Sequence, residues 1–208
     1  MTSAGALVFI VDDDAAVRKS LAHLIRAAGY EAETYASARD FLARPQPSVP
    51  CCLVLDVRMP GLTGLELQAA LSTAGRPWSI VFVTGYGDVP VSVNAMKGGA
   101  VDFLTKPVGK QALLGALERA LTRSREMLRK DARAAHIQSL IKTLTPREVE
   151  VFALVVTGML NKQIAAELGV GEKMVKVHRG RVMEKMRAGS LAELVRLADE
   201  GGVISPRA

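Results

Sequence analysis

The sequence predicts an α/β domain with a five-stranded parallel sheet, followed by an all-α domain of four helices. Over roughly the first 120 residues, apolar runs rich in β-forming residues alternate five times with segments of helical periodicity. The main runs are continuously apolar and no hairpin turn joins them, which favours a parallel sheet covered by helices on both faces. From residue 145 onward there is no strand pattern, and only helical periodicity remains.

Apolar spacing and breaker residues place the elements of the α/β domain. The first helix carries Val17, Leu21 and Ile25 on one face and stops at Gly29. The second strand has the weakest pattern, and the proline-rich residues 45–50 form a loop. Strands are expected at residues 7–11, 31–35, 53–55, 80–84 and 101–104. Helices are expected at residues 15–28, 38–43, 65–74, 89–98 and from 111 to about 122.

The second domain starts with a strong helix signal. Thr145 can cap the helix, Pro146 suits the first helical position, and Glu148 closes a capping box. The four helices are expected at residues 146–157, 161–168, 172–187 and 190–200. We assign residues 1–122 to the first domain, 123–142 to a helical linker and 143–208 to the second domain. Residues 117–141 have few breakers and many charges, so they are expected to extend the fifth helix or to form a helical linker, and a disordered tether is the alternative.

Composition limits the classes of protein. The chain has 208 residues, of which 49% are hydrophobic, and it lacks the run of roughly 20 apolar residues that spans a bilayer. Its start does not resemble a secretory signal, so we expect a soluble, cytoplasmic protein with no membrane partner. Cys51 and Cys52 are neighbours without further metal ligands nearby, so they are expected to act as small apolar residues.

Charge is unevenly distributed along the chain. The net charge is +6. Residues 1–124 hold 12 Lys and Arg against 11 Asp and Glu, whereas residues 125–208 hold 15 against 10. The excess of +5 in the second part suits a polyanionic partner there, although charge alone is a weak signal.

Polar residues gather where the predicted strands end. In a parallel sheet, binding sites form at the carboxyl ends of the strands. A nucleotide-binding sheet would place glycines after the first strand, but this chain places three carboxylates there. Clustered carboxylates repel a phosphate unless a cation lies between them, and oxygen ligands suit Mg²⁺. The residues in question are Asp12, Asp13 and Asp14 after strand one, Asp56 after strand three, Thr84 after strand four and Lys106 after strand five.

This set of residues makes sense as a site for phosphoryl transfer to a carboxylate. Asp56 would be the nucleophile, while Asp13, Asp56 and, through water, Asp12 would hold Mg²⁺. Lys106 and the Thr84 hydroxyl would contact phosphoryl oxygens. A single Asp after a strand is usually only a helix cap or turn former. The prediction therefore depends on all these residues occurring together, in order, at one edge of the sheet.

Four motifs resemble the receiver domains of response regulators over about residues 5–122. They are VDDD at 11–14, LDVRMPG at 55–61, VTG at 83–85 and FLTKP at 103–107. The resemblance implies a flavodoxin-like fold, phosphorylation of Asp56 by a histidine kinase or small phosphodonor, and dependence on Mg²⁺. It also implies a metal contact from the backbone carbonyl of Arg58. The runs at 87–90 and 95–103 are similar to the FixJ-type subgroup.

The same resemblance implies a switch through Thr84 and Phe103. Many family members have Tyr where Phe103 stands, so ring packing rather than a hydroxyl would carry the change here. Phe103 as a simple core residue is the alternative. Asp14 also departs from the family pattern, because Glu is common at its position.

Residues 161–180 have the spacing of a helix-turn-helix, in which the second helix enters the major groove of DNA. Val175 and Val182 would face the core, whereas the opposite face is basic. Lys or Arg can bond guanine edges and Val can contact a thymine methyl group. A solvated basic face is the alternative reading of the charge. The candidate DNA contacts are Asn161, Lys162, Lys173, Lys176, Val177, His178, Arg179 and Arg181.

Three motifs resemble the LuxR-type DNA-binding domain over about residues 143–199: LTPREVEV at 144–151, NKQIA at 161–165 and VKVHR at 175–179. By this resemblance Lys176 and Val177 would reach bases. Contacts with the DNA backbone would be supported by Asn161, Lys162, Lys173 and His178. Gly171 and Met174 stand where the family often has Ser or Thr. Gly180 inside the helix costs about 1 kcal/mol relative to Ala.

We therefore expect a phosphorylation-dependent transcriptional regulator of a two-component system. Its partners would be a histidine kinase, double-stranded promoter DNA, a second copy of the chain and RNA polymerase. It would act as a homodimer and an activator, and it would not be an enzyme beyond phosphorylating and dephosphorylating itself. A DNA-binding protein whose receiver only dimerises, and a Mg²⁺-dependent phosphatase, are the alternatives; the phosphatase lacks an acid–base residue beside Asp56.

Overall fold

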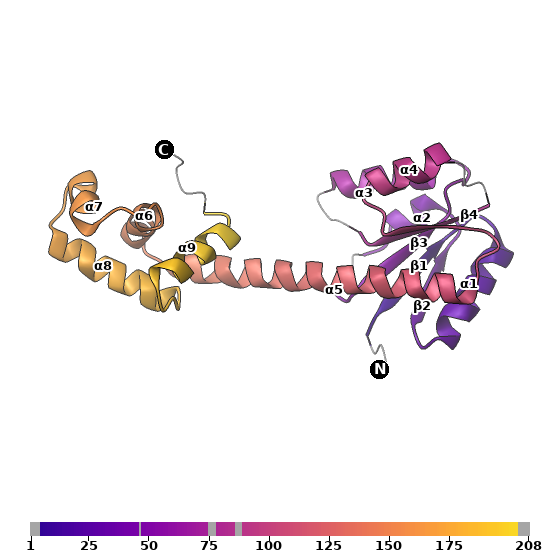
Figure 1. Cartoon of the computed structure of the whole chain (residues 1–208), viewed down its shortest axis with the longest axis horizontal. Coiled ribbons are helices and arrows are strands. Elements are labelled where there is room, and N and C mark those ends of the chain that lie inside the picture. Colours follow the sequence, from indigo (N-terminus) through magenta and orange to yellow (C-terminus); the bar gives the residue numbers. More distant parts are fainter. Residues whose placement is uncertain (1–4, 46, 75–77, 86–88, 204–208) are drawn as a thin grey trace. The chain divides into compact units, whose positions relative to one another are not determined.

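The computed structural model describes residues 5–45, 47–74, 78–85 and 89–203. They form two compact units, Met1–Leu128 and Arg129–Ala208, each with its own core (Figure 1). Within the described parts, no helix is both long enough and apolar enough to cross a membrane.

The first unit contains a five-stranded sheet in which all paired strands are parallel. The strand order is β2-β1-β3-β4-β5, which is the flavodoxin-like order, so the predicted fold class is confirmed. Strand β3 starts with the two cysteines, two residues before the predicted start at residue 53, and Cys52 is fully buried. The strands are β1 (Leu7–Val11), β2 (Glu31–Tyr35), β3 (Cys51–Leu55), β4 (Ile80–Thr84) and β5 (Asp102–Thr105).

Five helices cover the two faces of this sheet. Residues of α1 and α5 pack in one core, and residues of α2, α3 and α4 pack in the other (Figure 1). Helix α5 continues from the predicted segment 111–122 through residue 141, as expected if the linker extends the fifth helix, because no Gly or Pro follows Gly115 before that point. The helices are α1 (Ala15–Ala27), α2 (Ala38–Leu42), α3 (Gly64–Thr73), α4 (Val89–Lys97) and α5 (Lys110–Ile141).

The second unit is all-helical, and the end of α5 contributes to its core through Ile137. The predicted capping box is present: Glu148 N donates to Thr145 Oγ1 at 3.3 Å, and Thr145 N donates to a Glu148 carboxylate oxygen at 2.9 Å. Gly169 ends α7 with a φ of +65°, a backbone conformation that glycine adopts without strain. The helices are α6 (Pro146–Val155), α7 (Asn161–Leu168), α8 (Glu172–Lys185) and α9 (Leu191–Glu200).

Candidate functional site

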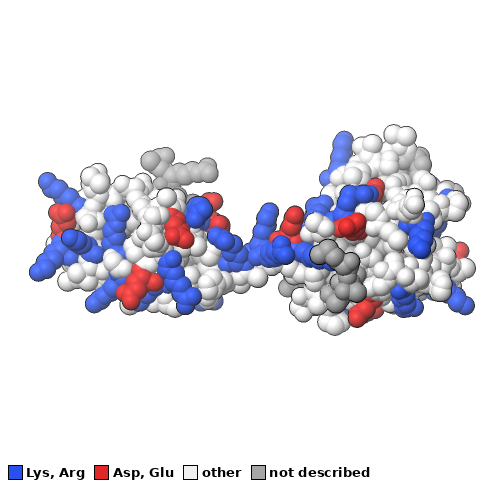
Figure 2. All heavy atoms as spheres, turned by 60° about the horizontal axis from the view of Figure 1, so that its bottom comes forward, with Lys and Arg blue, Asp and Glu red and all other residues white. Residues whose placement is uncertain are grey.

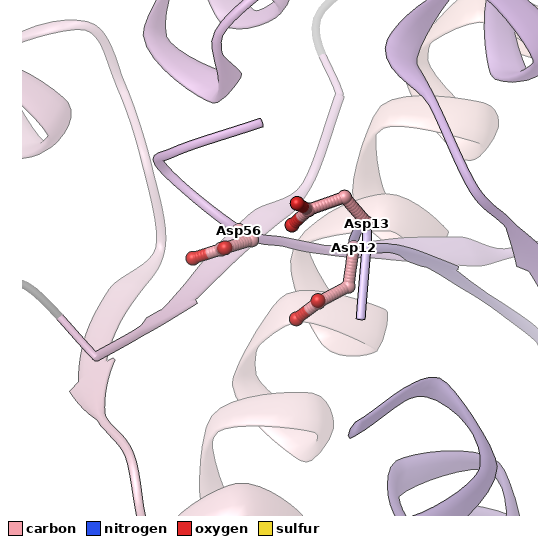
Figure 3. A group of neighbouring side chains, drawn as sticks. All are labelled: Asp12, Asp13 and Asp56. Carbon is pink, nitrogen blue, oxygen red and sulfur yellow. The ribbon is translucent and has the colours of Figure 1, made fainter. Parts of the chain in front are cut away.

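The strand order brings three aspartates together at one edge of the sheet. β1 and β3 are neighbours and Val11 pairs with Leu55, so the residues that follow them leave the sheet side by side. Carboxylate oxygens of Asp12, Asp13 and Asp56 all lie within 4.8 Å of one another (Figure 3). Asp12 and Asp56 are buried, whereas Asp13 is exposed. The predicted acidic cluster is therefore formed.

Asp14 has a different role from the two aspartates before it. Its carboxylate accepts hydrogen bonds from Ala16 N at 2.7 Å and Val17 N at 3.3 Å, so it caps the N-terminus of α1. The cap turns the chain sharply after Asp13. Asp14 N in turn donates to Asp12 Oδ1 at 2.9 Å, which fixes the orientation of the Asp12 carboxylate.

Lys106 supplies the positive charge of the site. Its Nζ lies 2.6 Å from Asp12 Oδ2 and 3.5 Å from Asp56 Oδ2. Lys106 N also bonds to the Thr84 carbonyl at 2.8 Å, so the lysine is held at the ends of β4 and β5. The Lys106–Pro107 peptide bond is cis. Burial lowers the pKa of Lys106, but the hydrogen bonds and charges of Asp12 and Asp56 outweigh burial and raise it.

The electrostatic environment of Asp56 is unfavourable for its negative charge. Burial raises the pKa of the Asp56 carboxyl, and the nearby Asp12 charge raises it further. Lys106, a hydrogen bond from the Thr84 hydroxyl and one from Val57 N at 2.8 Å only partly offset these effects. Among the described residues, Lys106 is thus the cation that pairs with Asp12 and Asp56, and the exposed Asp13 lies beside them. The donor set, consisting of hard oxygen ligands with an excess of negative charge, fits a divalent cation such as Mg²⁺.

The remaining predicted receiver residues lie on β4 and β5 or shortly after β3. Thr84 is fully buried at the end of β4. The Phe103 ring on β5 is half-buried and lies 6.1 Å, centroid to centroid, from the Phe82 ring. Arg58 is exposed two residues after Asp56. Residues 87 and 88 of the FixJ-like run lie outside the described residues.

Gly64 is a residue of the site that the sequence analysis missed. A Cβ atom at this position would lie only 2.1 Å from the backbone carbonyl oxygen of Asp56, so no other residue fits without moving the backbone. Gly64 N also donates to the Val57 carbonyl at 2.9 Å. The first turn of α3 is therefore packed directly against the backbone of Asp56. The short spacing of Gly61 and Gly64 was the available signal.

Helix α8 carries most of the candidate DNA contacts in the second unit. Val175 and Val182 are fully buried, as predicted for the core-facing side of the helix. His178 and Arg179 are half-buried, and Arg179 Nη1 donates to Asn161 Oδ1 at 3.1 Å, which ties α8 to the start of α7. Lys and Arg side chains project from this unit with acidic side chains between them (Figure 2). The exposed candidates are Lys162, Lys173, Lys176, Val177 and Arg181.

Comparison with known proteins matches both units to established families. Residues 8–118 match the response regulator receiver domain, and residues 142–198 match the luxR family of bacterial regulatory proteins. Nodulation protein W of Bradyrhizobium diazoefficiens is 49% identical over 97% of this chain and 88% of its own length. Transcriptional regulatory protein FixJ of Azorhizobium caulinodans is 43% identical over 94% of this chain and 93% of its own length.

A solved structure of the response regulator StyR is 46% identical to this chain. The alignment covers 95% of this chain and all of StyR, with a TM-score of 0.79. The relatives thus match both units together rather than only one of them.

Proposed function

We propose a phosphorylation-controlled mechanism for this chain, which belongs to the response regulator family and carries a LuxR-type DNA-binding domain. The family implies regulation of transcription, with a histidine kinase and DNA as partners. The observation that carries the mechanism is the cluster itself: the carboxylates of Asp12, Asp13 and Asp56 lie within 4.8 Å of one another, and Lys106 pairs with both Asp12 and Asp56.

Asp56 is the proposed phosphoryl acceptor. One of its carboxylate oxygens attacks phosphorus, and the P–N bond to the histidine of the kinase breaks. The electron pair of that bond goes to the imidazole nitrogen, which takes up a proton. With a small donor such as acetyl phosphate, a P–O bond breaks instead and acetate leaves. The protein is itself the phosphoryl acceptor, so no substrate other than the phosphodonor is required.

Asp12, Asp13, Asp56 and the backbone carbonyl of Arg58 are the proposed ligands of Mg²⁺. The excess of carboxylates over ammonium groups in the pocket supports this assignment. When bound, Mg²⁺ would neutralise charge on the carboxylates and on the incoming phosphoryl oxygens. Lys106 would contact one phosphoryl oxygen and the Thr84 hydroxyl another.

Thr84 and Phe103 are the proposed switch residues. A phosphoryl group on Asp56 would draw the Thr84 hydroxyl away from its present hydrogen bond with the Asp56 carboxyl. The half-buried Phe103 ring, on the strand next to Thr84, would then repack. We propose that this change favours a homodimer through the surface around α4 and α5.

The dimer would place two α8 helices in the major groove of promoter DNA at half-sites roughly one helical turn apart. Lys176 and Val177 would contact bases, and Asn161, Lys162, Lys173, His178, Arg179 and Arg181 would support backbone contacts. We propose that the outcome is activation of transcription with RNA polymerase as a further partner, because the class that the sequence resembles leans toward activation.

Labelling with radioactive acetyl phosphate tests the first step. Wild-type protein should incorporate phosphate only when Mg²⁺ is present, and Asp56→Asn should incorporate none. Asp14→Asn is the matched control, because Asn also caps helices well and this aspartate lies outside the proposed ligand set. Equal labelling of wild type and Asp56→Asn would overturn the assignment. DNA affinity that is identical with and without acetyl phosphate would favour the constitutive DNA-binding alternative.

A further inference from the structure

An ion pair holds the last turn of α8, and neither of its two residues is among the candidate DNA contacts. Lys185 Nζ lies 2.6 Å from Glu148 Oε2, and the Glu148 side chain is only 2% exposed. Lys185 is the last residue of α8, whereas Glu148 belongs to the first turn of α6. Carboxylates are almost never fully buried unless they are paired, so the contact with Lys185 is what allows Glu148 to be buried here.

Glu148 has little freedom to move. The Glu148 oxygen that binds Lys185 also accepts the hydrogen bond from Thr145 N, and Glu148 N donates to the Thr145 hydroxyl. The position of this carboxylate is therefore set by the capping box at the start of α6. The partner lysine gains a fixed anchor rather than a mobile surface carboxylate.

Lys185 makes a second contact at the corner between α5 and α6. Its Nζ donates to the backbone carbonyl of Thr143 at 3.0 Å. Thr143 lies two residues after the end of α5 and three residues before the start of α6. The end of α8 is thus connected to two points on the corner, so the contacts oppose rotation of the helix about its axis as well as tilting.

The geometry of an α-helix relates this anchor to the proposed DNA-facing residues. Lys176 precedes Lys185 by nine residues, which corresponds to about 180° around the helix and about 13 Å along it. Lys176 is exposed, while Val182 and Met186 beside Lys185 are buried. Holding Lys185 toward the α5–α6 corner therefore turns Lys176 away from the domain.

We propose that Glu148 and Lys185 are positioning residues for DNA recognition, which set the rotation of α8 and so the base contacts of Lys176 and its neighbours. The proposal rests on the DNA-facing side assigned to α8 under the proposed function. It assigns no contact with DNA to either residue. The rival role for Lys185 is a direct contact with a DNA phosphate.

The two roles predict opposite results for Glu148→Gln. This variant keeps an acceptor for the capping box but removes the negative charge that pairs with Lys185, so charge alone would strengthen binding to any sequence. Loss of positioning would instead weaken binding to the preferred sequence only. Base-specific contacts are sensitive to small displacements, and a single mismatched pair costs about 1–3 kcal/mol, or roughly 5- to 150-fold in affinity.

The probe is a DNA duplex selected from a random-sequence library with acetyl-phosphate-treated wild-type protein. Affinity for this duplex and for a scrambled duplex of the same length is measured at several salt concentrations. We expect Glu148→Gln and Lys185→Met each to lose about tenfold or more in affinity for the selected duplex. Affinity for the scrambled duplex should change by less than about twofold, and Lys185→Arg should restore most of the discrimination.

Two further variants keep the test decisive. Glu148→Gln/Lys185→Met removes both charges and should fold even where a single variant does not, because replacing a whole buried pair is often neutral for stability. It should show the same loss of discrimination as the single variants. Arg133→Gln/Glu200→Gln, which removes an exposed ion pair of the same unit, is the matched control and should discriminate like wild type.

Either of two results would overturn the proposal. Unchanged or stronger binding of Glu148→Gln to the selected duplex would show that anchoring of Lys185 by Glu148 does not contribute to DNA recognition. An equal loss on both duplexes for Lys185→Met, with the salt dependence reduced by about one ion, would make Lys185 a phosphate contact. Lys176→Ala tests the DNA-facing side separately: if it binds both duplexes like wild type, the proposed side of α8 is wrong, whatever Glu148→Gln shows.

Discussion

Each unit of the molecule contains a lysine paired with a buried carboxylate, but the balance of charge differs between them. In the receiver unit, Lys106 is shared between Asp12 and Asp56, with Asp13 close by. In the DNA-binding unit, Lys185 meets Glu148 alone and completes its bonding with the Thr143 carbonyl. Among the described residues, the acidic cluster of the receiver unit thus has more carboxylates than cations paired with them, whereas the buried carboxylate of Glu148 is matched by Lys185.

The pKa directions of the two carboxyl groups express this difference. Burial raises the pKa of Asp56, and its neighbours do not fully reverse the effect. The hydrogen bond from Lys185, together with that from Thr145, lowers the pKa of Glu148. An under-compensated pocket is suited to taking up a cation and a phosphoryl group, while a compensated pair is suited to holding helices in place. We therefore propose that a lysine–carboxylate pair supports phosphoryl transfer in one unit and holds helices in place in the other.

The largest effect should come from removing each lysine in turn. Lys106→Met should reduce labelling of Asp56 by acetyl phosphate about 100-fold or more, because the cation that faces the phosphoryl oxygens is lost. Lys185→Met should label like wild type. The measurement is the initial rate of phosphate incorporation at saturating Mg²⁺. Equal rates for Lys106→Met and wild type would show that Lys106, like Lys185, has no part in phosphoryl transfer to Asp56.

The packing around Asp56 can be tested with two glycines. Gly64→Ala should destabilise the receiver unit by about 3 kcal/mol, because its Cβ would meet the backbone of Asp56. Gly98→Ala should cost about 1 kcal/mol, since its Cβ would meet only the Gln68 amide. That amide can turn away, although it would lose its 3.0 Å bond to the Ala95 carbonyl.

Urea unfolding followed by the fluorescence of Trp78 measures both variants, because Trp78 packs in the core of the receiver unit. Gly115→Ala is the control, since its Cβ would make only an ordinary contact in a helix. The control should be neutral or slightly stabilising. A smaller loss for Gly64→Ala than for Gly98→Ala would contradict the close approach of α3 to Asp56.

A smaller effect than that of Gly64→Ala should appear as a dependence on pH in the DNA-binding unit. The pKa of Glu148 is lower in the folded protein than its ordinary value of 4.5, so the unfolded chain binds the proton more readily. The stabilisation is complete above that ordinary value and is lost as the pH falls through the lowered value. At neutral pH, Glu148→Gln should be less stable by about 2 kcal/mol, a loss moderated by the partial exposure of Lys185.

Amide hydrogen exchange in α6 and α8, corrected for intrinsic rates, measures this dependence for one unit at a time. The protection of wild type should fall toward that of Glu148→Gln as the pH drops below 4.5. Parallel curves for the two proteins would show that Glu148 keeps an ordinary pKa in the fold.

Much of the receiver site was readable from the sequence because its parts lie at strand ends. Apolar runs located the strands, and parallel topology then brought Asp12, Asp56, Thr84 and Lys106 to one edge without any knowledge of side-chain packing. The roles that packing decides were not readable. Asp14 was left out of the predicted ligand set, but its role as the cap of α1 was not predicted.

Close approaches in three dimensions also escaped prediction. The contact between Gly64 and Asp56 depends on how α3 leaves the loop, and the pairing of Lys185 with Glu148 joins residues 37 positions apart. Arg44 is a further case: it precedes a proline-rich loop, yet its guanidinium lies 3.8 Å from the centroid of the Phe9 ring. Local patterns give no information about such contacts, because they arise between elements that are distant in sequence.

The end of helix α5 has a consequence for how this DNA-binding module can be moved between proteins. Ile137 is 1% exposed, and a Cβ on Gly201 would lie 2.7 Å from it, so α5 and the end of α9 are in close contact. Gln138 and Arg133 on the same helix bond to Gly201 and Glu200. A copy of the module that begins at residue 143 would lack these residues of α5, and the apolar core that they cover would be exposed to water. Gene fusions and recombination events that preserve a working output module must therefore carry the last turns of α5 with it.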